Sequence, residues 1–376
     1  MDWHEVKFFE SASNLKEVIK GSVGRTPSSA TANEIAVCIQ QGRLFFEAAS
    51  VAPLPIRPLQ VHYGIIGFAK AIMLARRLIS LSTLKPSHGL TDATADNVKI
   101  EQLAVRVERE GTFPNFNDTI GAMGRISTFS HSMPQAAIKP FDSVTALVGA
   151  TIGMKDVLSR IPHLGALYER TFEEPAKTIS ISLHQTIGGL WELRIDDPEL
   201  YSDRNSLVAL VRKWRVKHPF VDNWYFCSAQ QAWGNSILIF GNYEKGHLDD
   251  TIAGAMREDH IGSPFQNQVG DRTPVDFMSI LPPLSGGITR ESPHAIEALG
   301  GTMLSEYSLQ YMASFMLGSL VRYRPQIWQH AISRSTTAQS PADDRCLALV
   351  ERFLDIVLDS WPRLLVHAID ATATRR

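Results

Sequence analysis

Cysteine is scarce in this sequence, and its three cysteines, Cys38, Cys227 and Cys346, lie far apart. Such wide spacing argues against a disulfide framework and against paired zinc ligands, and it is typical of a reducing compartment. Long apolar runs are scarce too. The best candidate, residues 61–75, is interrupted by Lys70 and is shorter than the roughly 20 residues that span a bilayer. The charged N-terminus has no apolar signal-peptide core. We therefore expect a cytoplasmic protein with no membrane segment.

Several common catalytic motifs are also missing. There is no Gly-X4-Gly-Lys-Ser/Thr phosphate loop, no Rossmann glycine fingerprint, no Gly-X-Ser-X-Gly elbow and no His-Glu-X-X-His zinc helix. An assignment as a common ATPase, dehydrogenase, hydrolase or metalloprotease therefore lacks support. The formal net charge is −2, so nucleic-acid binding would need a local basic patch. We predict neither a cofactor nor a metal.

The residues that are present are typical of a folded globular protein, since 44% are apolar and 20% are charged. Apolar residues at helical spacing predict long helices at 59–81 and 302–323. The first of these is apolar on most of its surface, which indicates a buried helix. A further helical stretch covers 343–369, where Pro362 is expected to separate two helices.

The middle of the chain carries the strand signals. Alternating apolar residues predict strands at 103–107, 177–185, 189–196, 223–229 and 236–243. Helices are expected at 141–150 and 206–216. The predicted fold class is mainly α, and α+β overall. An N-terminal helical region at 1–176 and a C-terminal helical region at 286–376 would pack into one core, with a small α+β insertion at 177–285 between them.

The segment RYRPQIWQH at 322–330 contains a candidate catalytic pair, Arg324 and His330. It resembles the Arg-X(4–6)-His motif of helical HEPN ribonucleases, in which the arginine holds a phosphate and the histidine acts on the ribose hydroxyl or the leaving oxygen. Such sites often form between two protomers. Pro325 places Arg324 at a helix junction and His330 in the next helix. The alternative is structural, with Arg322 or Arg324 binding carbonyls or a carboxylate at the junction, Trp328 in the core and His330 on the surface.

A basic stretch at 212–218 is a second candidate. Its basic side chains could hold a nucleic-acid backbone while the tryptophan stacks on a base. The residues concerned are Arg212, Lys213, Trp214, Arg215 and Lys217. The alternative is a solvated helix face anchored by one tryptophan.

A third candidate is a polar pocket between the long helix at 59–81 and the loop that contains His88. Lys70 and Arg76 would suit an anion such as a nucleotide phosphate, and Tyr63 and His88 would lie beside them. Arg322 is a further ligand-binding candidate. The alternative is that these residues serve the packing of the long helix.

Acidic residues and histidines gather in one polar stretch. They are His247, Asp249, Asp250, Asp259 and His260. All five are residue types that ligate metals, but their spacing matches no closed metal site. We therefore do not predict a metal site there.

Several segments, in this order along the chain, resemble the YaaC-like proteins of bacteria. The most specific is the last, with its Arg-Tyr-Xaa-Pro step before a tryptophan. The segments are PLQVHYGIIGFAKAIML at 58–74, HGL at 88–90, GTFPNF at 111–116, VLSRIPHLGALYE at 157–169 and YSLQYMASFMLGSLVRYRPQIW at 307–328.

The resemblance implies a bacterial cytoplasmic protein with mostly helical architecture. Some relatives are encoded beside nucleotide-metabolism genes, and others lie in anti-phage defence neighbourhoods. We therefore expect a protein that acts by binding, as a regulatory or defence component. Its partner would be a nucleotide, RNA, a protein from the same operon or a second copy of the chain. The alternative is a metal-independent HEPN-like ribonuclease centred on Arg324 and His330.

Overall fold

The computed structural model describes residues 3–96, 99–130, 133–186, 190–243, 265–266, 273–286, 289, 293–332 and 341–370. Its helices are α1 (His4–Phe8), α2 (Ala12–Val23), α3 (Ser29–Val51), α4 (Arg57–Arg77), α5 (Thr112–Gly121), α6 (Met154–Leu158), α7 (Gly165–Phe172), α8 (Arg204–Lys217), α10 (Phe277–Ile280), α11 (Glu306–Tyr323), α12 (Pro325–Ile332) and α13 (Pro341–Ile369). Its strands are β1 (Leu90–Asp92), β2 (Ala104–Val107), β3 (Arg125–Ser130), β4 (Met133–Ile138), β5 (Thr151–Gly153), β6 (Thr178–Ser180), β7 (Ser182–Gln185), β8 (Trp191–Asp197), β9 (Tyr225–Ala232), β10 (Asn235–Gly241), β11 (Phe265–Gln266), β12 (Leu284–Ser285) and β13 (His294–Ile296).

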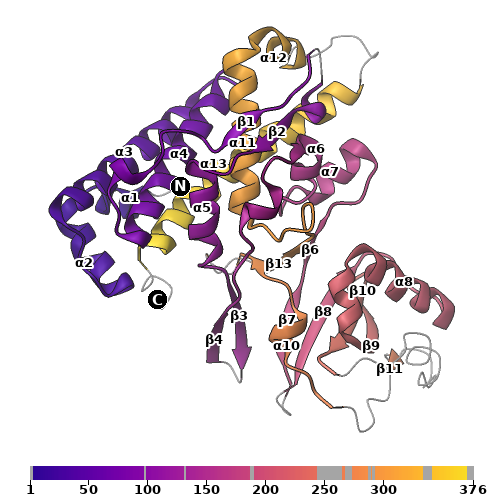
Figure 1. Ribbon diagram of the computed structural model, residues 1–376. Coiled ribbons are helices and arrows are strands. Elements are labelled where there is room, and N and C mark those ends of the chain that lie inside the picture. The colour runs from indigo at the N-terminus through magenta and orange to yellow at the C-terminus, as the bar shows by residue number, and fades with distance from the viewer. Residues whose placement is uncertain are drawn as a thin grey trace.

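Helices from both ends of the chain form one helical body. α3 and α4 pack along each other, and α4 also contacts α11 and α13, as Figure 1 shows. One continuous cluster of buried apolar side chains joins these helices. The prediction that N- and C-terminal helices share a core is therefore confirmed, and the chain is mainly α-helical. Among the described residues, no helix combines the length and the apolarity that crossing a membrane requires.

Serine residues define the beginnings of three of these helices. The hydroxyl of Ser28 accepts a hydrogen bond from the amide of Thr31 at 3.0 Å before α3. The hydroxyl of Ser305 accepts one from the amide of Ser308 at 3.2 Å before α11, and Ser11 has the same role before α2. Each cap satisfies an amide that the first helical turn leaves without a partner.

The crossing of α3 and α4 depends on glycine. A Cβ atom added to Gly67 would lie 2.8 Å from the Cα of Gly42, so the two backbones touch there. Gly64 leaves room for the ring of Phe46 in the same way. Such close approach lets the apolar surface of α4 be covered on several sides. This agrees with the prediction of a buried helix.

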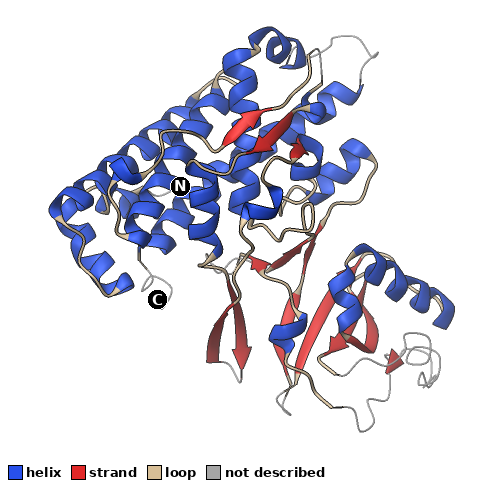
Figure 2. Cartoon of the chain, in the orientation of Figure 1, coloured by secondary structure: helices blue, strands red, loops and turns tan. Residues whose placement is uncertain are grey.

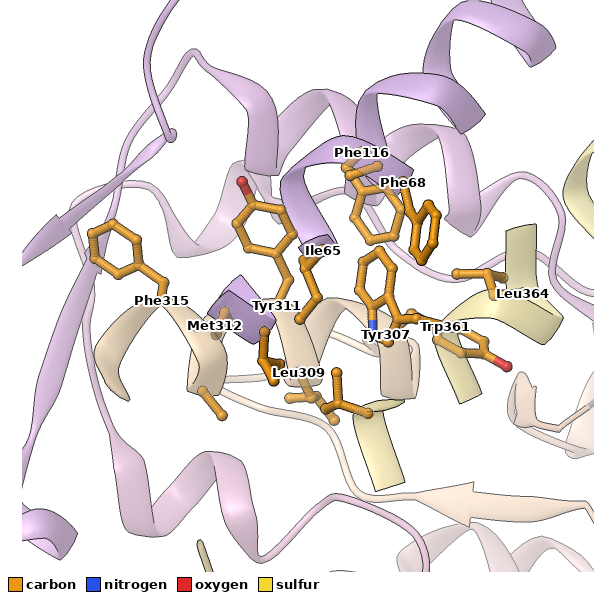
Figure 3. Close-up of a cluster of buried hydrophobic side chains, with 14 of the residues drawn as sticks. Ile65, Phe68, Phe116, Tyr307, Leu309, Tyr311, Met312, Phe315, Trp361 and Leu364 are labelled. Atoms are coloured by element: carbon orange, nitrogen blue, oxygen red, sulfur yellow. The ribbon is translucent and has the colours of Figure 1, made fainter. Parts of the chain in front are cut away.

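Aromatic side chains fill the space around α11. Phe116 of α5 stacks on Trp361 of α13, with ring centroids 5.1 Å apart, and it also stacks on Tyr311 at 5.9 Å. Tyr307 meets the edge of Trp361. Figure 3 shows these rings between helices that lie far apart in the sequence. Aromatic pairs of this kind add to the burial energy of the core.

The strands lie mostly at the other end of the molecule (Figure 2). A five-stranded antiparallel sheet has the order β11-β9-β10-β8-β7, and the buried side of α8 joins it in a second hydrophobic cluster. Smaller sheets have the orders β1-β2-β5 and β12-β13-β6, and β3 pairs with β4. The predicted strands at 189–196, 223–229 and 236–243 and the predicted helix at 206–216 are confirmed.

The predicted strand at 177–185 is present but divided. Its first part, β6, pairs with β13, where Ile179 lies opposite Ala295. Its second part, β7, pairs with β8, where Leu183 lies opposite Leu193. One alternating stretch therefore serves two sheets. The β3–β4 hairpin and the short strands β1 and β5 were not predicted.

Two helix predictions were wrong. The stretch 141–150 forms only a 3₁₀ turn at Val144–Leu147, because Gly149 takes a left-handed conformation and donates its amide to the carbonyl of Val107 at 2.8 Å. Pro362 does not separate two helices, because it lies inside α13. Its neighbours Trp361 and Leu365 are fully buried, and their packing outweighs the hydrogen bond that proline removes.

Candidate functional site

Two adjoining cavities lie beside α4 and the loop before β1, the larger on the side of α3 and the smaller on the side of α11. The larger has a volume of about 410 Å³ and is lined by Phe45 and Lys70, among others. The smaller has a volume of about 230 Å³ and is lined by His62 and Arg322, among others. Tyr63 and His88 line both cavities. We call the two cavities together the junction pocket.

The loop that carries His88 is fixed by backbone contacts with the beginning of α5. The amide of Thr112 donates to the carbonyl of Ser87, and the amide of Phe113 donates to the carbonyl of His88, each at 2.9 Å. Gly89 and Gly111 both have positive φ, and a Cβ on Gly111 would lie 2.4 Å from the nitrogen of Gly89. Only glycine allows this contact, so it holds His88 in one place at the pocket wall.

Three cationic side chains line the pocket, and one of them, Lys85, pairs with Glu110 at 2.8 Å. Arg322 donates from Nη1 to the Tyr63 hydroxyl at 2.9 Å, and its guanidinium lies 5.0 Å from the ring centre of Tyr323. Within the part of the chain that the structure describes, neither Lys70 nor Arg322 forms an ion pair with a carboxylate. Asp92 also lines the smaller cavity, but the guanidinium of Arg324 lies 3.5 Å from its carboxylate.

Two histidines meet in the smaller cavity. The rings of His62 and His88 have centroids 5.5 Å apart. Burial lowers the pKa of His62 to about 3, and the adjacent His88 adds to this effect. Burial, followed by the charges of Arg322 and Lys70, lowers the pKa of His88 as well. Both imidazoles are therefore neutral at pH 7, and the positive charge of the pocket comes from Lys70 and Arg322.

Four of the five predicted ligand-binding residues line the junction pocket: Tyr63, Lys70, His88 and Arg322. Arg76 does not, because it follows Lys70 by six residues and so points about 240° around the helix from it. Burial and the charge of Arg125 lower the pKa of Arg76.

His62 was not predicted to line the pocket. The only signal was a polar side chain next to Tyr63 in a largely apolar stretch. Such a side chain is as compatible with a packing role as with a binding role.

Arg324 lies at the junction of α11 and α12. Its guanidinium donates to the carbonyls of Ala95 at 2.6 Å and of Thr94 at 2.8 Å. α12 begins at Pro325, as expected. His330 belongs to α12, but its side chain lies outside what the structure describes. The ribonuclease hypothesis needs both side chains at one scissile bond, and it stays a prediction.

Trp328 anchors α12 to the connection between α3 and α4, 273 positions earlier in the chain. Its indole is 1% exposed and donates to the carbonyl of Pro55 at 2.9 Å. The tryptophan therefore has the core position that the structural alternative for this segment expects.

The basic residues of α8 are largely engaged within the fold. Lys213 pairs with Glu199 at 2.8 Å, and the buried Arg215 donates to the carbonyl of Trp224 at 3.2 Å. Lys217 lies 5.3 Å from the ring centre of Trp214, and Trp214 itself is only 7% exposed. Arg212 is exposed. The tryptophan face is thus packed against the protein rather than open for stacking on a base. Nucleic-acid binding by this stretch stays a prediction.

The acidic and histidine residues considered as metal ligands lie outside the described residues. These are His247, Asp249, Asp250, Asp259 and His260.

Comparison with known proteins gives one match. A family model described as YaaC-like protein matches residues 7–369. No curated protein and no solved structure matches the chain. The match covers both the helical body and the strand-rich part, and it includes every residue named for the junction pocket. It confirms the resemblance found in the sequence. The chain therefore belongs to the family of YaaC-like proteins.

Proposed function

We propose that this YaaC-like protein acts by binding, and that the junction pocket holds an anionic small molecule of the nucleotide class. The observation that carries this proposal is the pair of cations, Lys70 and Arg322, on either side of Tyr63 and His88, without a carboxylate partner among the described residues.

The pocket is suited to a phosphate. The guanidinium of Arg322 can donate two parallel hydrogen bonds to phosphate oxygens, and the ammonium of Lys70 acts as a compact positive charge. His88 is half-buried between them. Partial shielding from water strengthens such interactions relative to a fully exposed site.

The pocket also offers aromatic surface for a base or another flat ring. Phe45 and Tyr63 stack with ring centroids 5.4 Å apart and an interplanar angle of 28°. Aromatic faces bind nucleobases of any sequence, because every base has a π-face. The larger cavity, at about 410 Å³, falls within the range of roughly 300–1,000 Å³ that is typical of small-molecule sites.

We place this binding activity in the bacterial cytoplasm, in a regulatory or anti-phage defence role. The ligand would act as a signal passed to a protein partner or to a second copy of the chain. Support comes from the family resemblance and from the three cysteines, which are few and lie far apart in the sequence. Such sparse cysteines, which cannot build a disulfide framework, are typical of a reducing compartment.

Isothermal titration calorimetry with nucleoside mono-, di- and triphosphates tests the proposal. We expect binding by the wild type and a loss of about tenfold or more in affinity for Lys70→Met and for Arg322→Gln, since each removes a charge-assisted contact. Lys20→Met and Arg352→Gln are matched controls, because these exposed cations lie on α2 and α13 outside the pocket.

Two results would overturn the proposal. One is the absence of binding by the wild type to every nucleotide tested. The other is an equal loss of affinity in the pocket variants and in the controls, which would indicate general attraction to charge rather than a site.

A further inference from the structure

One face of α3 is apolar although it points away from the core. Val37, Leu44 and Val51 are 61%, 52% and 85% exposed. They follow one another at intervals of seven residues, which is about two helical turns, so they lie in one line along the helix. α3 itself runs along the outer edge of the helical body (Figure 1). We call this line of three apolar side chains the α3 stripe.

The spacing of the α3 stripe is that of a coiled-coil seam. Gln41 and Ala48 lie between its members, so that the positions from Val37 to Val51 alternate in steps of four and three residues. Single exposed apolar residues are common on protein surfaces. A line of them with this period presents side chains that can insert between those of a second helix.

The outer face of α3 also carries no free charge. The helix is described from end to end and contains three charged residues, Glu34, Arg43 and Glu47. Glu34 accepts hydrogen bonds from the hydroxyl of Ser80 at 3.1 Å and from the amide of Leu81 at 2.8 Å. Arg43 and Glu47 pair with each other at 2.7 Å. A second copy of this face can therefore approach without repulsion between like charges and without burying an unpaired charge.

The stripe reads the same in both directions from Leu44. If two copies of α3 pair antiparallel, Leu44 lies on the two-fold axis, and Val37 of each copy lies opposite Val51 of the other. The same pairing sets the long side chain of Gln41 opposite the short one of Ala48. A parallel pairing would set Gln41 against Gln41 and would leave a gap between the two alanines. Antiparallel helices also align their dipoles favourably.

We infer that the outer face of α3 is a self-association surface, at which two copies of this chain pair antiparallel about Leu44. Gln41 also lines the larger cavity of the junction pocket, so the second copy lies beside that cavity. This inference goes beyond the proposed function, because it names the partner as a second copy and gives its place of contact. It does not depend on the binding of a nucleotide.

Sedimentation equilibrium of the full chain, over concentrations from about 1 μM to about 1 mM, tests the inference. We expect the wild type to form a dimer. Leu44→Glu should weaken the association by about tenfold or more, because two carboxylates would face each other across the two-fold axis. Leu44→Ala, which removes apolar contact without adding charge, should weaken it by a smaller factor.

A matched control adds the same charge to another exposed apolar residue. Val216 is 82% exposed on α8, and Val216→Glu should leave the dimer unchanged. Circular dichroism of each variant shows that the chain is folded, which is expected because both replaced side chains are largely exposed.

Crosslinking by a short bismaleimide tests the antiparallel pairing. Leu44→Cys should crosslink with itself, because the two-fold axis places the two thiols together. Val37→Cys and Val51→Cys should crosslink when they are mixed, and neither should do so alone. The wild type is the control for crosslinking through its own cysteines, of which Cys227 is partly exposed.

Each outcome supports or overturns the inference. A wild type that stays monomeric at about 1 mM, a dimer that Leu44→Glu leaves intact, or a dimer that Val216→Glu weakens equally would overturn it. Self-crosslinking of Val37→Cys would overturn the antiparallel pairing. The absence of nucleotide binding would overturn the proposed function alone, so the two fail separately.

Discussion

Two deeply buried histidines make the stability of the fold depend on pH. His62 is 4% exposed and His218 is 2% exposed, and burial lowers the pKa of each to about 3. In the unfolded chain the pKa of each imidazole returns to its ordinary value of 6.5. Between about pH 3 and pH 6.5 the unfolded state therefore binds more protons than the native state. The contribution of the two neutral histidines to stability is complete above pH 6.5 and is lost as the pH falls toward 3.

We expect the free energy of unfolding to decrease as the pH is lowered from 6.5 to 4. Each of the two histidines would contribute a slope of up to about 1.4 kcal/mol per pH unit. His218→Phe should make this dependence shallower, because the phenyl ring keeps the contact with Trp214, whose ring centroid lies 5.4 Å from that of His218, and cannot take up a proton. Urea denaturation at a series of pH values measures the slope. A slope in His218→Phe equal to that of the wild type would contradict the assignment of His218 as a buried neutral residue.

Among the helices, two prolines show what a sequence can and cannot predict. Pro325 begins α12, and Pro362 lies within α13. The local sequence favours a helix boundary at both. The outcome at Pro362 depends on the burial of Trp361 and Leu365 against distant helices, which sequence spacing does not contain.

Some residues of the junction pocket could likewise be predicted from the sequence and others could not. Helical spacing and the position of His88 were enough to predict that Lys70, Tyr63 and His88 belong together. Arg76 was assigned by proximity in sequence, although helical phase places it elsewhere. His62 was missed because its place in the pocket wall depends on contacts such as that with Ser314, which is 252 residues away in the chain. Local patterns therefore predicted the elements and part of the site, and long-range packing determined the rest.

The close crossing of α3 and α4 leads to a prediction about stability. Gly67→Ala should lower the free energy of unfolding by about 1–3 kcal/mol, because its Cβ would meet the backbone of Gly42 and force the helices apart. Gly21→Ala is the matched control. Gly21 lies within α2 with open space around it, so alanine should raise stability by up to about 1 kcal/mol through its helix propensity.

Chemical denaturation measures the change in the free energy of unfolding for each of the two glycine variants. Equal effects of the two substitutions would show that the α3–α4 contact does not limit stability.

The architecture of the molecule joins sequence positions that are far apart. α4 lies near one end of the chain, and it packs on α11 and α13 at the other end. Most of the side chains on α4 are buried by these contacts and by α3. Folding of the N-terminal helices therefore depends on helices that are synthesised much later.

A chain that ends after residue 304 should fail to fold. It would expose the apolar surface of α4 that α11 and α13 normally cover. We expect low solubility and no cooperative thermal transition by circular dichroism, and recovery of both properties when residues 305–376 are co-expressed as a separate chain. A cooperative transition of the shortened chain alone would show that the N-terminal helices form an independent domain.

The hydrogen bond between Tyr63 and Arg322 joins residues that are 259 positions apart. Its two partners leave the ribosome at widely separated times, and the smaller cavity, which Arg322 lines, is not complete until the second has arrived. A nucleotide that requires Lys70 and Arg322 together would therefore ignore prematurely terminated copies of the protein. Occupancy of the pocket would then report that translation has passed Arg322.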